Sequence, residues 1–344
     1  MITTKGLNFK TFFKLSGVYL FRLIIINSLV AALYYFGVIS FKIPWLPVSI
    51  IGTAVAFYIG FKNNNSYGRL WEARKIWGGI VNDSRSWGMM IDGFITNQFA
   101  VNKKTDEEIY QIKKQLIYRH IAWLYAHRSQ LLVPTSWEHG SQNGLAKKTA
   151  RYFQKNFGVG LLDDEVTKKE LTQFLPNEEF QSLINYQNTA TQIINQQSRE
   201  LTRLRSEGMI DDFRHMELTE VLRNFYSLQG KNERIKKFPL PRQYSAMSGY
   251  FVWIFIVLLP FSMIPELLEL KNWGLLLSVP ITVLVGWVYR IMELVGDFSE
   301  NPFEGLMNDI PMMSLCRTIE IDLREMLSET ELPAAIKPVN GILN

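Results

Sequence analysis

The sequence has little cysteine and little histidine. Among its 344 residues there are one cysteine, Cys316, and four histidines. A single thiol excludes a disulfide within the chain and a paired-cysteine zinc or redox site. We expect Cys316 to be buried in an amphipathic helix. His120 and His127 stand seven residues apart on one helical face. They could form a metal pair, but the pattern favours packed or hydrogen-bonded side chains.

The sequence also lacks the motifs of common enzymes. It contains no glycine-rich phosphate loop, no HExxH motif and no EF-hand spacing. The long apolar stretches hold almost no titratable groups, which argues against a membrane enzyme and against a coupled transporter. Arg22 and Glu293, near the ends of two stretches, could pair as structural ions. The formal charge of +5 gives no argument for nucleic acid. We therefore expect no enzymatic activity and no nucleic-acid partner.

Four long apolar stretches are present instead. The clearest, residues 43–61, holds no charged side chain over 19 positions. As a helix it would span about 28 Å, close to the hydrocarbon thickness of a bilayer. The other three are residues 20–41, 244–264 and 272–289. One such stretch could be a buried core helix, but four in two hairpin-like pairs predict membrane spans. The predicted fold class is all-α, with four spans and a helical cytosolic region.

Lysine and arginine flank the stretches unevenly. They precede the first, follow the second and precede the third, whereas the two short connections hold only Lys42 and Lys271. Because cytoplasmic loops carry the excess of positive charge, both termini and the long middle segment are predicted to be cytoplasmic, in a multi-pass protein of the cell membrane. The predicted order is a cytosolic N-terminus (1–19), a transmembrane hairpin (20–61), a cytosolic helical region (62–242), a second hairpin (243–290), and a cytosolic C-terminal helix and tail (291–344).

The polar middle region shows apolar residues at helical spacing. Helices are expected over residues 109–127, from about Glu178 to Gly208, over 212–228 and over 314–328. Gly208 is a candidate helix C-cap. Residues 135–144 and 156–164 read as loops, and the acidic run 163–165 as a solvated loop or helix start.

The second stretch shows two faces. Gly52, Ala56 and Gly60 repeat every four residues, and small residues at that spacing let helices approach closely in lipid. A second set, Thr53, Phe57 and Phe61, also repeats every four residues and lies one residue further along the helix than the first set. From spacing alone, these rings could pack against another span or lipid, or they could face a pore. The charged and aromatic segment that follows includes Asn63, Asn64, Tyr67, Arg69, Trp71, Glu72, Arg74 and Trp77.

Two segments resemble the bestrophin family of ion channels in its bacterial form. The first is FKNNNSYGRLWEARKIWGGIVNDSRSW, which starts at Phe61. The second is ENPFEGLMNDIPMMSLCRTIEIDL, which resembles the family's NPF-plus-acidic segment and contains Asn301, Pro302, Phe303 and Asp309. The resemblance covers roughly residues 12–330.

The resemblance implies a homopentamer around one central pore, embedded in a lipid bilayer. The family's second span lines a narrow neck whose three rings lie four residues apart and end at the phenylalanine of a Gly-Phe pair. Gly60-Phe61 matches that pair, so the implied neck residues are Thr53, Phe57 and Phe61. Thr53 departs from the family pattern, because the family usually has an aliphatic or aromatic side chain at this position. The hydroxyl should make the outermost ring of the neck less apolar. A weaker match places a cytosolic aperture at Thr191.

The resemblance also raises the question of calcium, which animal members bind in a clasp. Asn301 and Asp309 match two clasp positions, but Leu306 and Phe298 replace the other acidic residue and the glutamine. Calcium prefers six to eight oxygen ligands. We therefore expect no cofactor and no calcium gating.

The expected activity is passive conduction of small monovalent ions through a hydrophobic neck that gates by dewetting. Phenyl edges of Phe57 and Phe61 turned toward the axis would favour anions weakly, whereas rings packed face-on would favour cations. Lys62 and Arg69 would raise the local anion concentration if they face the pore. We expect a modest preference for anions such as chloride. A monovalent cation channel of the same architecture is the alternative, and a non-conducting membrane scaffold is a further one.

Overall fold

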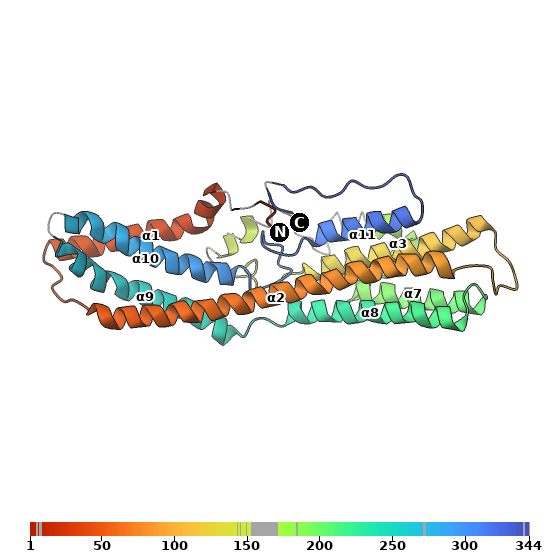
Figure 1. The fold of residues 1–344 in the computed structure, drawn as a ribbon, viewed down its shortest axis with the longest axis horizontal. Coiled ribbons are helices and arrows are strands. Elements are labelled where there is room, and N and C mark those ends of the chain that lie inside the picture. The colour runs from red at the N-terminus through yellow and green to blue at the C-terminus, as the bar shows by residue number, and fades with distance from the viewer. Residues whose placement is uncertain are drawn as a thin grey trace. The chain divides into compact units, whose positions relative to one another are not determined.

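The chain forms two compact units. The computed structural model describes all residues except 5, 7–8, 143, 145, 149, 153–170, 184, 271–272, 340 and 344. The span unit comprises residues 4–70 and 239–301, and the polar unit comprises residues 1–3, 71–238 and 302–344. Over the described part, regular structure is helical (Figure 1), apart from two isolated β-bridges that join Ile342 to Ile2 and to Val339. The predicted loop 156–164 and acidic run 163–165 lie outside the described residues.

The span unit contains α1 (Phe9–Tyr35), the first part of α2 (Trp45–Phe94), α9 (Arg242–Leu268) and α10 (Gly274–Asp297). Each of these helices is long and apolar enough to cross a membrane. The predicted fold class, an all-α protein with four spans, is confirmed. Helices α9 and α10 contain internal prolines, Pro260 and Pro265 in α9 and Pro280 in α10. Proline occurs within membrane-spanning helices because neighbouring groups can satisfy the backbone carbonyls that it leaves unpaired.

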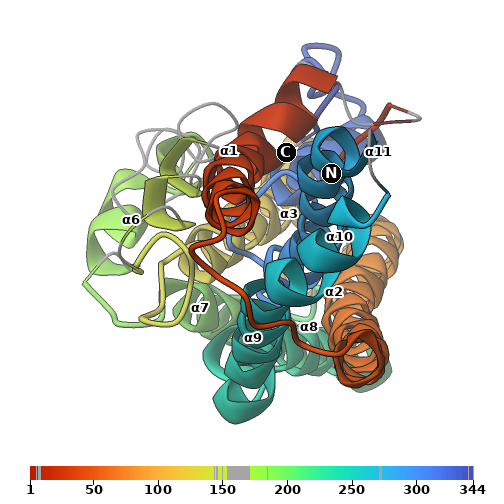
Figure 2. The ribbon, with the colours of Figure 1, turned by 90° about the vertical axis from the view of Figure 1, so that its left-hand side faces the viewer.

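Within the span unit, α10 packs against α9 and α1, and α1 also contacts α9. Figure 2 faces the ends of these helices and shows the connection from α1 to α2 crossing the end of α9. The connection is held on α9 by several contacts. The Ile43 amide donates to the Phe261 carbonyl at 3.2 Å, the rings of Phe41 and Phe261 stack, and Lys42 forms ion pairs with Glu266 and Glu269. The buried face of α2 packs on α9 through Val48, Val55, Ile59, Val252, Phe255 and Leu259.

The polar unit contains the second part of α2, α3 (Asp106–Leu131), α6 (Asn177–Leu183), α7 (Thr189–Ser206), α8 (Asp212–Lys237) and α11 (Met312–Met326). Helix α3 contacts α7, α8 and α11. The prediction of a single helix from Glu178 to Gly208 is wrong in its middle. The chain breaks between α6 and α7, and the Asn188 side chain caps α7 by accepting the Thr191 amide at 2.9 Å.

Gly208 is the helix terminator that the sequence predicts. Its φ of +73° is left-handed, and a Cβ at this position would lie 2.4 Å from the Phe99 carbonyl oxygen. Only glycine fits both the conformation and the space. Helix α8 runs on to Lys237, beyond the predicted end at residue 228.

The core of the polar unit is a stack of aromatic and imidazole rings. Trp123 lies parallel to His127, with ring centroids 5.6 Å apart, and next to His120 at 5.2 Å. His120 Nε2 lies 2.9 Å from Ser84 Oγ, and His127 Nε2 lies 3.1 Å from Asn232 Nδ2. Burial lowers the pKa of His120 to about 3 and that of His127 to about 4, so both rings are neutral at pH 7. The histidines are packed and hydrogen-bonded, as the spacing favoured.

Cys316 is fully buried beside this core, as predicted. Burial raises the pKa of its thiol to about 12, which leaves the group unreactive at neutral pH.

The buried histidines predict a loss of stability in acid. The unfolded chain protonates each histidine below about pH 6.5, whereas folded His120 stays neutral to about pH 3. The free energy of unfolding should therefore fall by about 1.4 kcal/mol per pH unit for each such histidine as the pH drops below 6.5. His120→Phe keeps the stack, and Ser84 Oγ still donates to the Ile80 carbonyl at 2.6 Å.

Denaturant unfolding in detergent between pH 7 and pH 5 measures the effect. The difference in unfolding free energy between wild type and His120→Phe should narrow or reverse in acid. Parallel profiles for wild type and His120→Phe would show that His120 is not held neutral by burial.

Candidate functional site

One face of α2 in the span unit is exposed. Phe57 and Phe61 are 66% and 63% exposed, and Thr53 is exposed on the same face. The Thr53 hydroxyl donates to the Ser49 carbonyl one turn earlier, at 3.0 Å. This bond uses the hydroxyl proton inside the helix and reduces the polarity that Thr53 presents outward. The three residues that the sequence groups therefore share one outward-facing stripe.

The opposite face of α2 is buried and carries a charge. Val55, Ile59 and Lys62 follow one another on that face, and Lys62 is only 1% exposed. Its ammonium lies 3.1 Å from Oε1 of Glu293 and 3.7 Å from Asp297 Oδ1, both on α10. Because an unpaired buried charge is very costly, rotation of α2 that breaks this pair is strongly disfavoured. The ion pair fixes which face of α2 points outward.

Two possibilities that the sequence left open for charged residues are not realised. Lys62 does not face the exposed stripe, since its ammonium is buried against α10 and neutralised there. Glu293, which is 4% exposed, pairs with Lys62 and with Arg290 at 2.5 Å rather than with Arg22. Arg290 also stacks on the Tyr19 ring at 4.4 Å. Sequence alone missed these partners because Lys62 and Glu293 stand 231 residues apart.

The predicted small-residue face is only partly a contact face. A Cβ at Gly52 would lie 2.8 Å from the Phe255 ring, so α9 approaches α2 closely there. Gly60 is exposed and has no neighbour within 4 Å of an added Cβ. A close approach also occurs at Gly296, which sequence reasoning missed: a Cβ there would meet Asn63 Oδ1 at 2.0 Å.

The end of this part of α2 is tied to α10 and the segment after it. The Asn63 amide donates to the Met292 carbonyl at 3.0 Å, and Arg69 Nε donates to the Glu300 carbonyl at 3.0 Å. The Glu300 carboxylate accepts from Arg242 at 2.8 Å and from Ser245 Oγ at 2.5 Å. Burial raises the pKa of Glu300. These residues anchor α2, and none of them lies on the exposed stripe.

The first segment continues into the polar unit at Trp71, whereas Tyr67 is exposed on the span-unit part of α2. Trp71 is about half exposed, and Glu72 forms an ion pair with Arg234 at 2.8 Å. Arg74 is half-buried, and the fully buried Trp77 ring stacks on His127. The first segment therefore contributes packing and ion pairs as well as the stripe.

The second segment forms a loop that its own acidic residue closes. Phe303 is buried with a left-handed φ of +69°, an uncommon conformation for a residue with a side chain. The Asp309 carboxylate holds the loop by accepting the amides of Phe303 at 3.0 Å, Gly305 at 2.8 Å and Ile310 at 2.7 Å. Lys236 donates to the Phe303 carbonyl at 3.2 Å. Asp309 and Lys236 thus fix both peptide groups of a strained residue.

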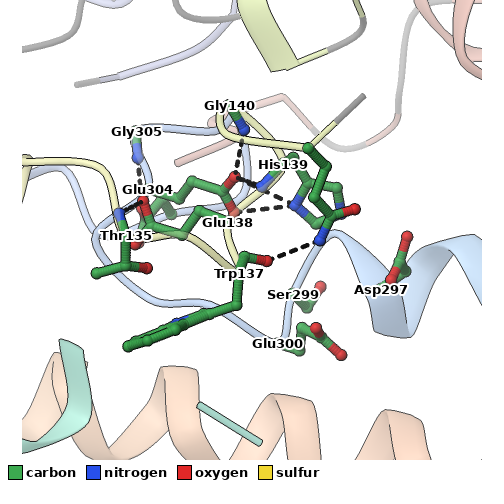
Figure 3. A network of polar contacts seen from close by, with 12 residues as sticks. Thr135, Trp137, Glu138, His139, Gly140, Asp297, Ser299, Glu300, Glu304 and Gly305 are labelled. Atoms are coloured by element: carbon green, nitrogen blue, oxygen red, sulfur yellow. Dashed lines mark hydrogen bonds and ion pairs between the residues drawn. The ribbon is translucent and has the colours of Figure 1, made fainter. Parts of the chain in front are cut away.

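A second carboxylate fastens the same loop to residues 135–140 (Figure 3). Glu304 accepts the His139 amide at 2.5 Å and the Gly140 amide at 3.3 Å, and His139 Nδ1 lies 3.0 Å from its other oxygen. The neighbouring Glu138 forms a buried ion pair with Lys236. Burial raises the pKa of Glu138 to about 7 despite that lysine. Sequence reasoning took residues 135–144 as a plain loop and missed this contact.

Asn301 and Pro302 precede this loop, and both are buried. Within the described residues, the Asn301 amide group has no hydrogen-bond partner. Thr191, the predicted aperture residue, is half-buried at the start of α7, where its hydroxyl accepts a hydrogen bond from Gln229 at 2.9 Å. The aperture assignment stays a prediction.

Comparison with known proteins decides the family. The family model described as Bacterial/Fungal Bestrophin protein matches residues 14–325. The chain belongs to the bestrophin family. This bestrophin is 23% identical over 325 residues to the voltage-dependent anion channel-forming protein YneE of Escherichia coli K12, a match that covers 94% of this chain and 90% of the relative. It is 26% identical over 301 residues to the voltage-dependent anion channel-forming protein RSc3414 of Ralstonia nicotianae, with 86% and 81% covered.

Solved structures share the fold. A bestrophin homologue from Klebsiella pneumoniae aligns with a TM-score of 0.69 at 19% identity, covering 90% of this chain and 99% of that chain. A variant of the same homologue aligns with a TM-score of 0.70 at 20% identity, covering 93% and 100%. Family and relatives together indicate a membrane channel rather than an enzyme.

The residues at the positions that match the family's calcium clasp do not fit a calcium ion. Both Asp309 oxygens already accept backbone amides, and Leu306 is a buried apolar side chain. Among the described residues, no group of three or more histidine, cysteine, aspartate or glutamate side chains could hold a metal. The clasp position matching Asp309 serves here to close the loop around Phe303.

Proposed function

We propose that this bestrophin assembles as a homopentamer in the cell membrane and conducts small monovalent ions, anions in preference to cations, through a neck lined by Thr53, Phe57 and Phe61. The observation that carries the proposal is the exposed stripe on α2, held outward by the buried Lys62–Glu293 pair. Two phenyl rings and a back-bonded threonine make a mostly apolar surface, which suits a gate that closes by dewetting.

The anion preference has two supports. Curated relatives that align over most of both chains are named voltage-dependent anion channel-forming proteins. Phenyl edges carry partial positive charge, so rings turned edge-on to an axis attract anions weakly. Lys62 does not contribute, because its charge is neutralised on the buried face. A neck without formal charge supports a modest rather than a strict preference.

The proposed topology places both termini and the polar unit in the cytoplasm, because lysine and arginine flank the spans on that side. The partners proposed for the chain are further copies of itself, the lipid bilayer and the permeant ions, with Thr191 lining a second constriction. No catalytic step is assigned to any residue.

Recordings from purified protein in planar bilayers test the function. In asymmetric potassium chloride, wild-type currents should reverse on the chloride side of zero, short of the chloride equilibrium potential. Reversal on the potassium side would establish the cation-channel alternative. Folded protein that passes no ions in bilayers or in vesicle flux assays would establish the non-conducting scaffold.

Phe57→Ala should raise open probability several-fold, because removal of a phenyl ring widens the neck and makes it easier to wet. Single-channel recording measures the change. Phe21→Ala is a matched control, since Phe21 lies on α1 and is 64% exposed, about as much as Phe57. Unchanged gating in Phe57→Ala, or an equal effect of the control, would contradict the neck assignment.

Calcium should not gate the channel, because the residues at the clasp position offer too few free oxygen ligands. Open probability measured with a chelator and with millimolar calcium should agree. A steep rise with calcium would show that the loop around Phe303 binds the ion in spite of the hydrogen bonds at Asp309.

A further inference from the structure

The exposed stripe on α2 changes from apolar to polar directly after Phe61. Asn64 is the next exposed residue with a side chain on this face, three residues on and about 4.5 Å further along the helix axis. Gly60 and Gly68 are exposed beside it and add no side chain. Asn64 is therefore the first polar group that an ion would meet after the phenyl rings.

The three consecutive asparagines have different surroundings. Asn63 donates to the Met292 carbonyl at 3.0 Å. Asn65 donates to the Phe61 carbonyl at 3.0 Å and lies 3.4 Å from the Tyr244 hydroxyl. Within the described part of the chain, Asn64 makes no hydrogen bond or ion pair, and it is exposed. The amides of Asn63 and Asn65 donate to carbonyls within the fold, and the exposed Asn64 amide is available to a ligand.

The formal charges near Asn64 are directed elsewhere. The Lys62 ammonium is buried against Glu293 and Asp297. Arg69 is half-buried and donates to the Glu300 carbonyl. Neutral dipoles therefore dominate the end of the stripe.

We propose that the Asn64 side chains of the assembled copies form a ring of carboxamides just inside the neck, which coordinates the permeating ion and sets how strongly the channel prefers anions. This inference rests on the proposed function. A carboxamide offers two N–H donors and one carbonyl acceptor. Its donors replace part of the hydration of an anion that leaves the apolar rings, and its carbonyl does the same for a cation. Because the group is neutral, the preference stays modest.

A charge placed at this position tests the proposal. Asn64→Asp should shift the permeability ratio toward cations by about tenfold or more, since several carboxylates would lie within a few ångströms of the ion path. Gln243→Glu is a matched control, because it also turns an exposed amide of the span unit into a carboxylate, but on α9 and away from the stripe, and should shift the ratio by less than about threefold. Reversal potentials in asymmetric potassium chloride measure both.

Equal shifts in the two variants would overturn the proposal, because the effect would then be general surface charge. No shift in Asn64→Asp would overturn it as well. If Phe57→Ala alters gating while Asn64→Asp leaves selectivity unchanged, only the role of Asn64 fails. If the wild type conducts nothing, the proposed function fails, and this inference fails with it.

A cysteine at the same position allows a second measurement, in which the charge is added only after the protein has folded and assembled. Asn64→Cys removes an amide that makes no hydrogen bond or ion pair among the described residues, and the native Cys316 is fully buried with a thiol pKa of about 12, so it should not react. Anionic and cationic thiosulfonate reagents applied to open channels should move the reversal potential of Asn64→Cys in opposite directions and leave the wild type unchanged. No response in Asn64→Cys would place the side chain away from the ion path.

Discussion

The buried ion pair between Lys62 and Glu293 is the constraint on which the arrangement of α2 depends. A lysine at the end of an apolar span must find a partner, and Glu293 on α10 supplies one at 3.1 Å. With Lys62 inward, helical geometry turns Thr53, Phe57 and Phe61 outward. Asn63 and Arg69 reinforce the same rotation through backbone carbonyls. A surface suited to line an ion path is thus produced by charges that never touch it.

A second set of charges shapes the loop that follows α10. Asp309 and Lys236 hold the backbone of Phe303 in a left-handed conformation, and Glu304 ties the loop to His139 and Gly140. In the polar unit these carboxylates act as hydrogen-bond acceptors for backbone amides. The acidic side chains of this segment therefore have a structural role in the loop that involves no metal ion.

Sequence patterns predicted the features that depend on local chemistry. Four apolar stretches identified the spans, Gly208 marked a helix end, and Thr53, Phe57 and Phe61 were grouped by spacing. Features that depend on distant partners were missed or mistaken. The sequence left open whether Lys62 faces a pore, because its partner Glu293 is 231 residues away. It also did not show that Asp309 accepts backbone amides, because those donors depend on the loop's conformation. The break before α7 was missed because apolar spacing continues across Asn188, which caps the second helix.

The central claim is that the stripe on α2 faces water along a shared axis rather than lipid. The most direct measurement is a structure of the assembled protein in a lipid bilayer. We expect five copies, with Phe57 and Phe61 of every copy converging on one continuous passage and the Lys62–Glu293 pair buried behind them. Phenyl rings turned toward acyl chains, or copies with no passage between them, would contradict the account.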